Sequence, residues 1–339
     1  MSDLITIDEL PQSLSSNGEE LLPAWQNETT VSLPMSSLNP FRGVDNTVID
    51  QPKGGIILGR SNTLSGCEID RSNTILAAEC GYVTGSDLSV VVGGLRNTIE
   101  KQVGSVIISS QSSNISGRET VPGNENFIAG SNQSSITGRN AFNAIIASGQ
   151  AKINQKSGGD TYAYIQCSGI LGGNNNTIYG QNNVIIGGSR NTTGSNSNAS
   201  PSFYGANAIS IGGGPIFNGS YPTTTAGNRA DSAWSVTIGG ICNTARQVGS
   251  VIIGGSNNCT ESNISFLPTG AGFIIGGNNN CVKSSHTNTS IINGTGMSTV
   301  SSDMLHTTRL YLSAAALPTT DPGIAGVVWR DGTDLKISV

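Results

Sequence analysis

Short apolar runs that end in glycine recur along the middle of the chain. One of them, SVIIGGSNNC, begins at Ser250, and near-copies begin at Leu88 (LSVVVGGLRNT), Gly169 (GILGGNNNTI), Asn183 (NVIIGGSRNT) and Gly272 (GFIIGGNNNC). The β-branched residues of each run are typical of a short strand, and the glycines suit a turn with positive φ. The Asn-Thr-Ile segments that follow, such as residues 97–99, predict a second short strand returning across the repeat.

The basic repeat unit is 15 or 16 residues long. One apolar residue before each Gly, Ala or Ser pair serves as an anchor, and the anchors are Leu58, Leu76, Val92, Ile108, Ile128, Ile146, Leu171, Ile186, Ile211, Ile238, Ile253, Ile275 and Ile292. Subtraction gives spacings of 18, 16, 16, 20, 18, 25, 15, 25, 27, 15, 22 and 17 residues, so insertions lie between units. A unit this short suits one coil of a solenoid. We therefore expect an all-β, elongated parallel β-solenoid over residues 46–297.

The first strand of the unit is apolar at every position, which predicts that both of its faces are buried. We expect Val251 and Ile253 to face the interior of the coil and Ile252 to face another copy of the chain. The residues expected at that interface are Val91, Ile107, Ile185, Ile252 and Ile274. Asparagines at matching positions of successive coils are expected to form amide ladders along the axis.

Composition and charge exclude several classes of protein. The 339 residues include 45 glycines, and 12% are charged, well below the 25% or so of an average domain. Regular Ile and Val clusters argue against disorder. The net charge of −5 comes without a basic stripe, so we expect no nucleic-acid partner. Residues 1–20 lack a basic export signal, and no apolar stretch reaches the roughly 18 residues of a spanning helix, so we expect no membrane insertion.

Six cysteines show no zinc-binding spacing, and we expect no metal and no cofactor. Cys259 and Cys281 each lie four residues after the second glycine of a pair, so they are expected to stack on neighbouring coils within reach of a disulfide. Assembly in a cytosol favours two reduced thiols there.

The repeats at residues 183–188 and 250–255 resemble the head repeats of trimeric autotransporter adhesins and the related repeats of tailed-phage fibres. The resemblance covers roughly residues 45–296 and implies a left-handed parallel β-roll that forms a homotrimer. Residues 1–45 resemble the attachment modules of phage fibres, which implies that Leu21, Leu22 and Trp25 contact tail or capsid proteins of a virion. Residues 298–339 resemble a C-terminal element of phage structural proteins and are expected to form a β-hairpin cap that turns at Asp331 and Gly332.

Candidate chemistry is sparse. The glycine pairs lack the Lys-Ser/Thr of a phosphate-binding loop, and His286 and His306 have no nucleophile motif beside them, so we expect no catalytic residues. Aromatic residues gather in the insertions, where loops on a rigid scaffold carry binding. The residues expected to bind a host glycan are Asp160, Tyr162, Tyr164, Phe203, Tyr204, Tyr221, Arg229, Trp234 and Phe266. The alternative is that their rings pack the insertions onto the roll or join subunits.

The expected function is that of a phage tail fibre, assembled in the host cytoplasm and located on the virion, which adsorbs to the host surface through lateral loops or its distal end. Two alternatives stay open. One is a capsid-decorating or tail-cementing fibre. The other is a tailspike that depolymerises glycan, against which the lack of paired carboxylates argues.

Overall fold

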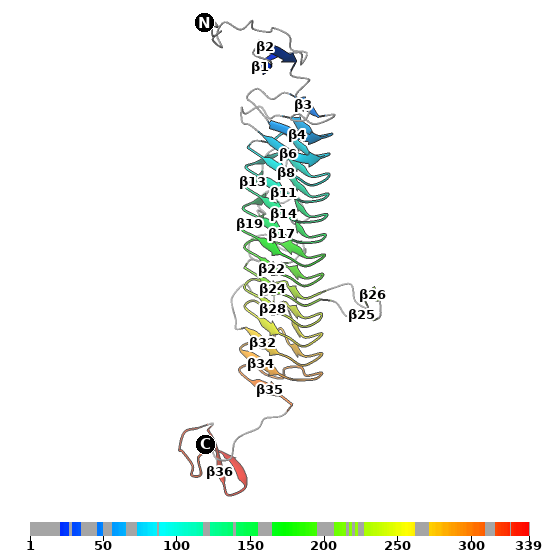
Figure 1. Ribbon diagram of the computed structural model, residues 1–339. Helices are drawn as coiled ribbons and strands as arrows, with labels where there is room; N and C mark the ends of the chain where they lie inside the picture. The colour runs from blue at the N-terminus through cyan, green and yellow to red at the C-terminus, as the bar shows by residue number, and fades with distance from the viewer. Residues whose placement is uncertain are drawn as a thin grey trace.

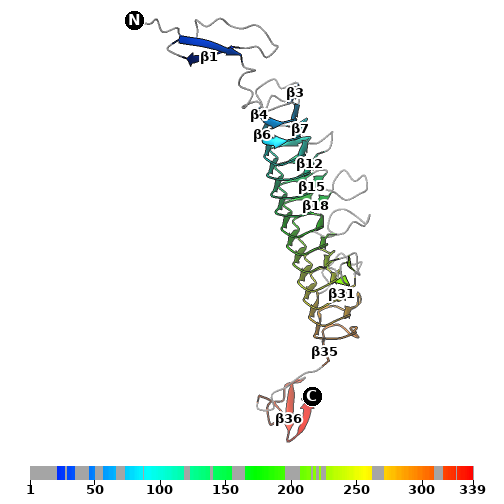
Figure 2. The same cartoon turned by 45° about the vertical axis from the view of Figure 1, so that its right-hand side comes forward.

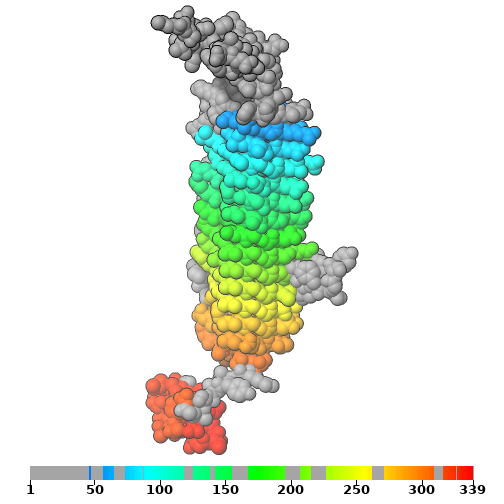
Figure 3. All heavy atoms as spheres, in the orientation of Figure 1, coloured from blue at the N-terminus to red at the C-terminus, as the bar shows by residue number. Residues whose placement is uncertain are grey.

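The fold is an all-β parallel β-solenoid, as expected from the repeat (Figure 1). A computed structural model describes residues 21–26, 29–34, 46–49, 56–65, 73–86, 88–117, 123–137, 140–154, 165–194, 207–214, 217–218, 221–222, 227–261, 271–308, 316–325 and 327–338. No helix occurs within these ranges. Figure 3 shows the coils as successive layers from blue to orange.

Two long parallel sheets form the sides of the rod. The first sheet has 14 strands: β4 (Ile56–Arg60), β6 (Thr74–Glu79), β8 (Val90–Val92), β11 (Val106–Ile108), β14 (Phe127–Ala129), β17 (Ala144–Ile146), β20 (Gly169–Leu171), β22 (Val184–Ile186), β24 (Ile209–Ile211), β28 (Val236–Ile238), β30 (Val251–Ile253), β32 (Gly272–Ile275), β34 (Thr289–Ile292) and β35 (Leu305–Thr307). The second sheet, seen in Figure 2, has 13 strands: β3 (Thr47–Ile49), β5 (Thr63–Ser65), β7 (Tyr82–Thr84), β9 (Thr98–Glu100), β12 (Asn114–Ser116), β15 (Ser135–Thr137), β18 (Lys152–Asn154), β21 (Thr177–Tyr179), β23 (Thr192–Thr193), β27 (Arg229–Ala230), β29 (Thr244–Ala245), β31 (Cys259–Thr260) and β33 (Cys281–Val282).

Shorter pairings complete the described elements. A third parallel sheet joins β10 (Gln102–Val103), β13 (Gly123–Asn124), β16 (Asn140–Ala141) and β19 (Ile165–Gln166). Antiparallel hairpins join β1 (Leu21–Gln26) to β2 (Thr29–Pro34), β25 (Phe217–Asn218) to β26 (Tyr221–Pro222), and β36 (Val328–Asp331) to β37 (Asp334–Ile337). The pairing of β36 with β37 lies where a C-terminal hairpin was expected, and its role as a cap stays a prediction.

Pairing between coils refines two sequence-based boundaries. Strand β35 pairs with β34, so the first sheet continues to Thr307, past the expected end of the repeat region at residue 297. Ile108 pairs with Ala129, which shows that the anchor chosen at Ile128 is wrong by one residue. The parallel pairing otherwise places anchors of neighbouring coils side by side, as at Ile238, Ile253 and Ile275.

The interior of the rod contains the middle residue of most three-residue strands of the two long sheets. In the first sheet Ile107, Ile185 and Ile252 are completely buried, and in the second sheet Ile99 and Ile178 are completely buried. Burial of each such side chain contributes about 1.5–3 kcal/mol. The residues before and after the middle one point outward because side chains alternate along a strand.

This burial corrects the predicted assignment of the two faces. Val91, Ile107, Ile185, Ile252 and Ile274 were expected to contact another copy of the chain, but each has no exposed surface within its own coil. They cannot reach a partner. The outward positions are instead the flanking ones, such as Val251 and Ile253.

The hydrophobic interior is interrupted near the middle of the rod. One apolar cluster ends at Ile185, and a second comprises Ala245, Ile252, Ile274, Val282 and Ile291. Between them the middle positions hold Thr193, Ser210, Ala230 and Thr237, all buried. The hydroxyl of Thr237 donates to Oγ of Ser210 at 3.0 Å, which satisfies part of this polar interior.

Buried asparagines link each coil to the next. Oδ1 of Asn243 accepts a hydrogen bond from the backbone N–H of Asn258 at 3.1 Å, and its Nδ2 donates to the carbonyl of Gly254 at 3.1 Å. Asn258 makes the corresponding bonds to Asn280 and Gly276 at 3.1 and 3.3 Å. The predicted asparagine ladder is confirmed, but its main partners are backbone groups of the next coil rather than other amides.

The second glycine of each pair lies against the next coil. A Cβ on Gly255 would lie 2.3 Å from the Gly277 carbonyl oxygen and 2.5 Å from Nδ2 of Asn258, whereas a Cβ on Gly254 would meet no atom within 4 Å. Both glycines have a left-handed backbone, with φ of +66° and +70°. The asparagine amide thus occupies the space that a side chain on the second glycine would need.

Coils without a glycine pair fill this space differently. Ser110, Ser131 and Ser148 stand at the second position, and the residues three positions later are Ser113, Ser134 and Ala151 instead of asparagine. Oγ of Ser110 donates to the carbonyl of Ile108 at 3.1 Å, so the hydroxyl finds a hydrogen-bond acceptor within its own turn. The two positions share one small volume, and only one of them can hold a long side chain.

Candidate functional site

The outer face of the first sheet is apolar along the rod. We define the apolar face as the first and third residues of its strands β8, β11, β14, β17, β20, β22, β24, β28 and β30, which are all Val, Ile, Leu, Phe, Ala or Gly. Several are well exposed, including Ile146 at 38%, Leu171 at 47% and Ile186 at 44%. A charge-free strip of this length makes the apolar face a candidate contact surface.

The outer face of the second sheet is polar. Its outward positions hold Thr63, Thr98, Lys152, Thr177, Thr192 and Arg229, among others. The rod therefore has one apolar and one polar side. Along the coils of the apolar face, the outward residues of the first strand are apolar, and those of the second strand are mostly polar. This contrast indicates that the apolar face has a specific role, because a general preference for apolar surface residues would appear on the outer faces of both sheets.

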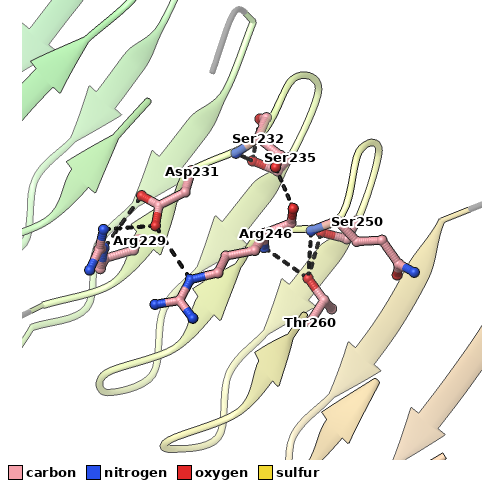
Figure 4. Close-up of polar contacts among 8 residues, drawn as sticks. Arg229, Asp231, Ser232, Ser235, Arg246, Ser250 and Thr260 are labelled. Carbon is pink, nitrogen blue, oxygen red and sulfur yellow. Dashed lines mark hydrogen bonds and ion pairs between the residues drawn. The ribbon is translucent and has the colours of Figure 1, made fainter. Parts of the chain in front are cut away.

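A charged cluster lies where strands β27 and β29 of the second sheet end (Figure 4). Oδ2 of Asp231 lies 2.8 Å from Nη2 of Arg229 and 3.7 Å from Nε of Arg246, and the Asp231 side chain is only 8% exposed. Burial raises the pKa of the Asp231 carboxyl above its ordinary value, and the two guanidinium groups only partly oppose this effect.

Hydroxyl groups surround this cluster and fix the turns that carry it. Oγ of Ser232 donates to the carbonyl of Arg246, and Oγ of Ser235 donates to the carbonyl of Ser232 at 2.6 Å. Oγ1 of Thr260 accepts from the N–H of Arg246 at 2.9 Å and lies 2.9 Å from Oγ of Ser250. The Asp231 carboxyl is thus fixed by its ion pairs to Arg229 and Arg246 and by the hydrogen-bonded turns around it.

Sequence reasoning singled out Arg229 but missed Arg246 and the column to which it belongs. Asp231, Arg246, Glu261 and Lys283 directly follow the two-residue strands β27, β29, β31 and β33, so they alternate in sign on successive coils. Aligning the repeats on the residue after the second strand would have revealed this alternation. Of the two histidines, His286 has its Nδ1 2.7 Å from Oγ1 of Thr299 and accepts a hydrogen bond from the Gln247 side chain at its carbonyl, and His306 lies on β35.

Two of the predicted glycan-binding residues lie close together in the sequence of one coil. Arg229 lies on β27 with its side chain 38% exposed, and Trp234 lies in the turn before β28 with 57% of its surface exposed. Trp234 has a left-handed φ of 54°, which is strained for a bulky side chain. Tyr221 begins β26 and pairs with Asn218. Asp160, Tyr162, Tyr164, Phe203, Tyr204 and Phe266 lie outside the described residues.

The residues expected to attach the protein to a virion lie on β1. Leu21 pairs with Pro34, Leu22 with Leu33, and Trp25 with Thr30. Their contacts with other proteins stay a prediction.

No site for a metal is formed by the described part of the chain, where no three His, Cys, Asp or Glu side chains lie close enough to hold an ion. In the same part, no helix has the length and apolar character needed to cross a membrane. No protein-family model matches the chain, and no curated protein matches it.

Replacing Asp231 by Asn is expected to change the free energy of unfolding at neutral pH by no more than about 1 kcal/mol, because the side chains of Arg229 and Arg246 are partly exposed and stay hydrated when the carboxylate is lost. Burial raises the pKa of Asp231 in the folded state above its ordinary value of 3.8. The stability of the fold should therefore fall as the pH rises from 3.8 through the raised pKa, because the carboxyl then ionises in the folded protein. Asp231→Asn should remove this dependence. Urea unfolding between pH 3.5 and 7, with Asp231→Ala as the control that leaves Arg229 without its acceptor, measures both effects. A cost of several kcal/mol for Asp231→Asn would contradict the expectation.

Proposed function

We propose that this chain is the repeat shaft of a homotrimeric fibre of a tailed phage, and that the fibre mediates adsorption to the host surface. The observation that carries the assembly part of the proposal is the apolar face, which is charge-free over nine strands of the first sheet. The phage part rests on the resemblance of the repeats at residues 183–188 and 250–255 to those of phage fibres and adhesin heads.

The spacing of the first sheet favours a second copy as the occupant of the apolar face. The nine strands of the apolar face give a length of about 40 Å, and three residues give a width of about 10 Å. The resulting area of roughly 400 Å² is about half of the 800 Å² or so that each partner buries in a stable interface, so neighbouring surface must contribute as well. Another copy repeats with the same spacing along its axis, so side chains of facing coils meet in the same way at every level.

Two alternatives use the same rod. A fibre that decorates the capsid or cements the tail would need the apolar face equally, and location on the particle separates it from an adsorption fibre. A tailspike would need two free carboxylates at a defined separation. Asp231 does not favour this reading because Arg229 and Arg246 neutralise it.

The proposal is tested by sedimentation of the purified protein, by antibody labelling of virions, and by competition between free protein and virions for host cells. A trimer that is located on the tail and blocks adsorption is expected. A monomer would remove the assembly argument. Labelling of the capsid shell without competition would replace adsorption by decoration, and release of reducing ends from host polysaccharide would favour the tailspike.

Trp234→Asn is expected to weaken binding of the fibre to host cells by about tenfold, as loss of one exposed aromatic contact does at other interfaces. Asparagine occupies the corresponding left-handed corner at Asn182, Asn207 and Asn288, so the change should leave stability equal or raise it by about 1 kcal/mol. Cell binding and thermal unfolding are measured on the same preparation. Unchanged binding would mean that the Trp234 ring does not contact the host surface. A lowered melting temperature would show that the ring stabilises its own turn by packing.

A further inference from the structure

Two cysteines lie side by side on the outer face of the second sheet. Cys259 begins β31 and Cys281 begins β33, and the two strands pair in parallel with these residues directly opposite each other. Their Sγ atoms are 3.0 Å apart, and both side chains are half-buried. Neighbouring strands lie about 4.8 Å apart, which falls within the range of roughly 4.4–6.8 Å between the Cα atoms of a disulfide.

The pair is chemically asymmetric. The hydrogen bond between the two thiols lowers the pKa of Cys259 to about 7, with help from Arg246 and against the effects of burial and of Glu261. The same hydrogen bond and burial raise the pKa of Cys281. Cys259 is therefore the thiol that ionises first, and thiolate is the form that attacks disulfides.

We propose that Cys259 and Cys281 are a site of reversible oxidation, at which a low-molecular-weight disulfide converts the two thiols into a bond between neighbouring coils. The Cys259 thiolate attacks one sulfur of the oxidant and displaces its other half as a thiolate. Cys281 then loses its proton to solvent, and its sulfur attacks Sγ of Cys259 and releases the second half of the oxidant. Two protein thiols are oxidised, and one disulfide is reduced to two thiols.

The bond would fasten a particular part of the rod. It would close a loop from residue 259 to residue 281, which contains strand β32 together with the insertion at residues 262–270. Cross-links of this kind stabilise mainly by restricting the unfolded chain. The coils on either side of the insertion would then be unable to separate locally.

The full-length protein, incubated with oxidised and reduced glutathione at fixed ratios and quenched with acid, tests this proposal. Trypsin cuts after Arg246 and Lys283, so one peptide carries both cysteines. We expect this peptide to become lighter by two hydrogen atoms and to resist alkylation, while cleavage after Glu261 should leave its two parts linked. Cys167, which is exposed on another coil, is the internal control and should gain glutathione instead.

Two serine variants test the order of attack. Cys281→Ser should trap glutathione on Cys259. In Cys259→Ser, Cys281 should react with oxidised glutathione at least about tenfold more slowly than Cys259 does in the other variant, because a smaller fraction of its thiol is ionised. Free thiols at both positions when Cys167 is already modified would overturn the proposal. So would glutathione on both cysteines of the unaltered chain, or a bond between two chains, seen as covalent oligomers on a non-reducing gel. These outcomes do not depend on whether the rod belongs to a phage fibre.

Discussion

Gly255→Ser is expected to destabilise the protein by about 3 kcal/mol or more, whereas Gly254→Ser should cost only about 1 kcal/mol. Both positions have a left-handed backbone, which penalises a side chain by roughly 1–2 kcal/mol. Only the side chain at Gly255 would also collide with the Gly277 carbonyl oxygen, 2.3 Å from the site of its Cβ, and with the Asn258 amide. Overpacking of this kind adds roughly 1–3 kcal/mol. Serine is accepted at the first position elsewhere, as Ser109 with φ of 46° demonstrates.

The measurement is urea unfolding of both variants at equal protein concentration, together with hydrogen exchange of the amides in the coil from Gly276 to Cys281. Exchange should accelerate there in Gly255→Ser and stay unchanged in Gly254→Ser. Equal losses in the two variants would mean that backbone strain dominates and that contact with the next coil has little effect.

The double variant Gly255→Ser with Asn258→Ser tests the shared space directly. Asn258→Ser alone loses bonds to the carbonyls of Gly276 and Gly277, at 3.3 Å each, and should cost about 2 kcal/mol. The combination reproduces the pair found at Ser110 and Ser113, so we expect the double variant to be at least about 1 kcal/mol more stable than the sum of the single changes. Additive losses would contradict the shared volume.

Leu171→Asp combined with Ile186→Asp is expected to convert the proposed trimer into monomers without unfolding the rod. These residues lie on neighbouring strands of the apolar face and are 47% and 44% exposed in a single chain, so a carboxylate there is hydrated until subunits associate. Burying an unpaired carboxylate at an interface costs several kcal/mol. Three copies multiply this cost in one trimer.

The matched control changes the polar side of the same two coils. Thr177→Asp with Thr192→Asp places equal charge on the second sheet, where we expect the trimer to persist. Sedimentation velocity gives the oligomeric state, and circular dichroism checks that strands remain. A trimer that survives the change at Leu171 and Ile186 would exclude the apolar face as the contact between subunits.

Much of the fold could be predicted because the repeat is regular. Glycine pairs and Ile-rich runs at intervals of 15 or 16 residues limited the fold to a solenoid, and the ends of the strands followed from glycine and asparagine. Which side chains of the first strand face the interior could not be predicted in the same way. Val251, Ile252 and Ile253 are all apolar, so a period of two gives no sign of which set faces inward.

A usable signal was present in the second strand. Thr98, Ile99 and Glu100 alternate clearly, and the buried Asn97 has the same parity as the buried Ile99. Ser250 precedes Ile252 in the same way, and both are buried. Reading the first strand by analogy with the second would have placed Ile252 inside.

The sequence by itself determined the period, the strand and turn positions, the asparagine ladder and the parallel β-solenoid, because each depends on local pattern repeated many times. Only the tertiary structure decided which apolar residues remain outside, why Gly255 rather than Gly254 must be glycine, and that Asp231 is neutralised by two arginines. The decisive contacts come from neighbouring coils, such as the Gly277 carbonyl beside Gly255 and Arg246 beside Asp231, and their separation is set by how one coil stacks on the next.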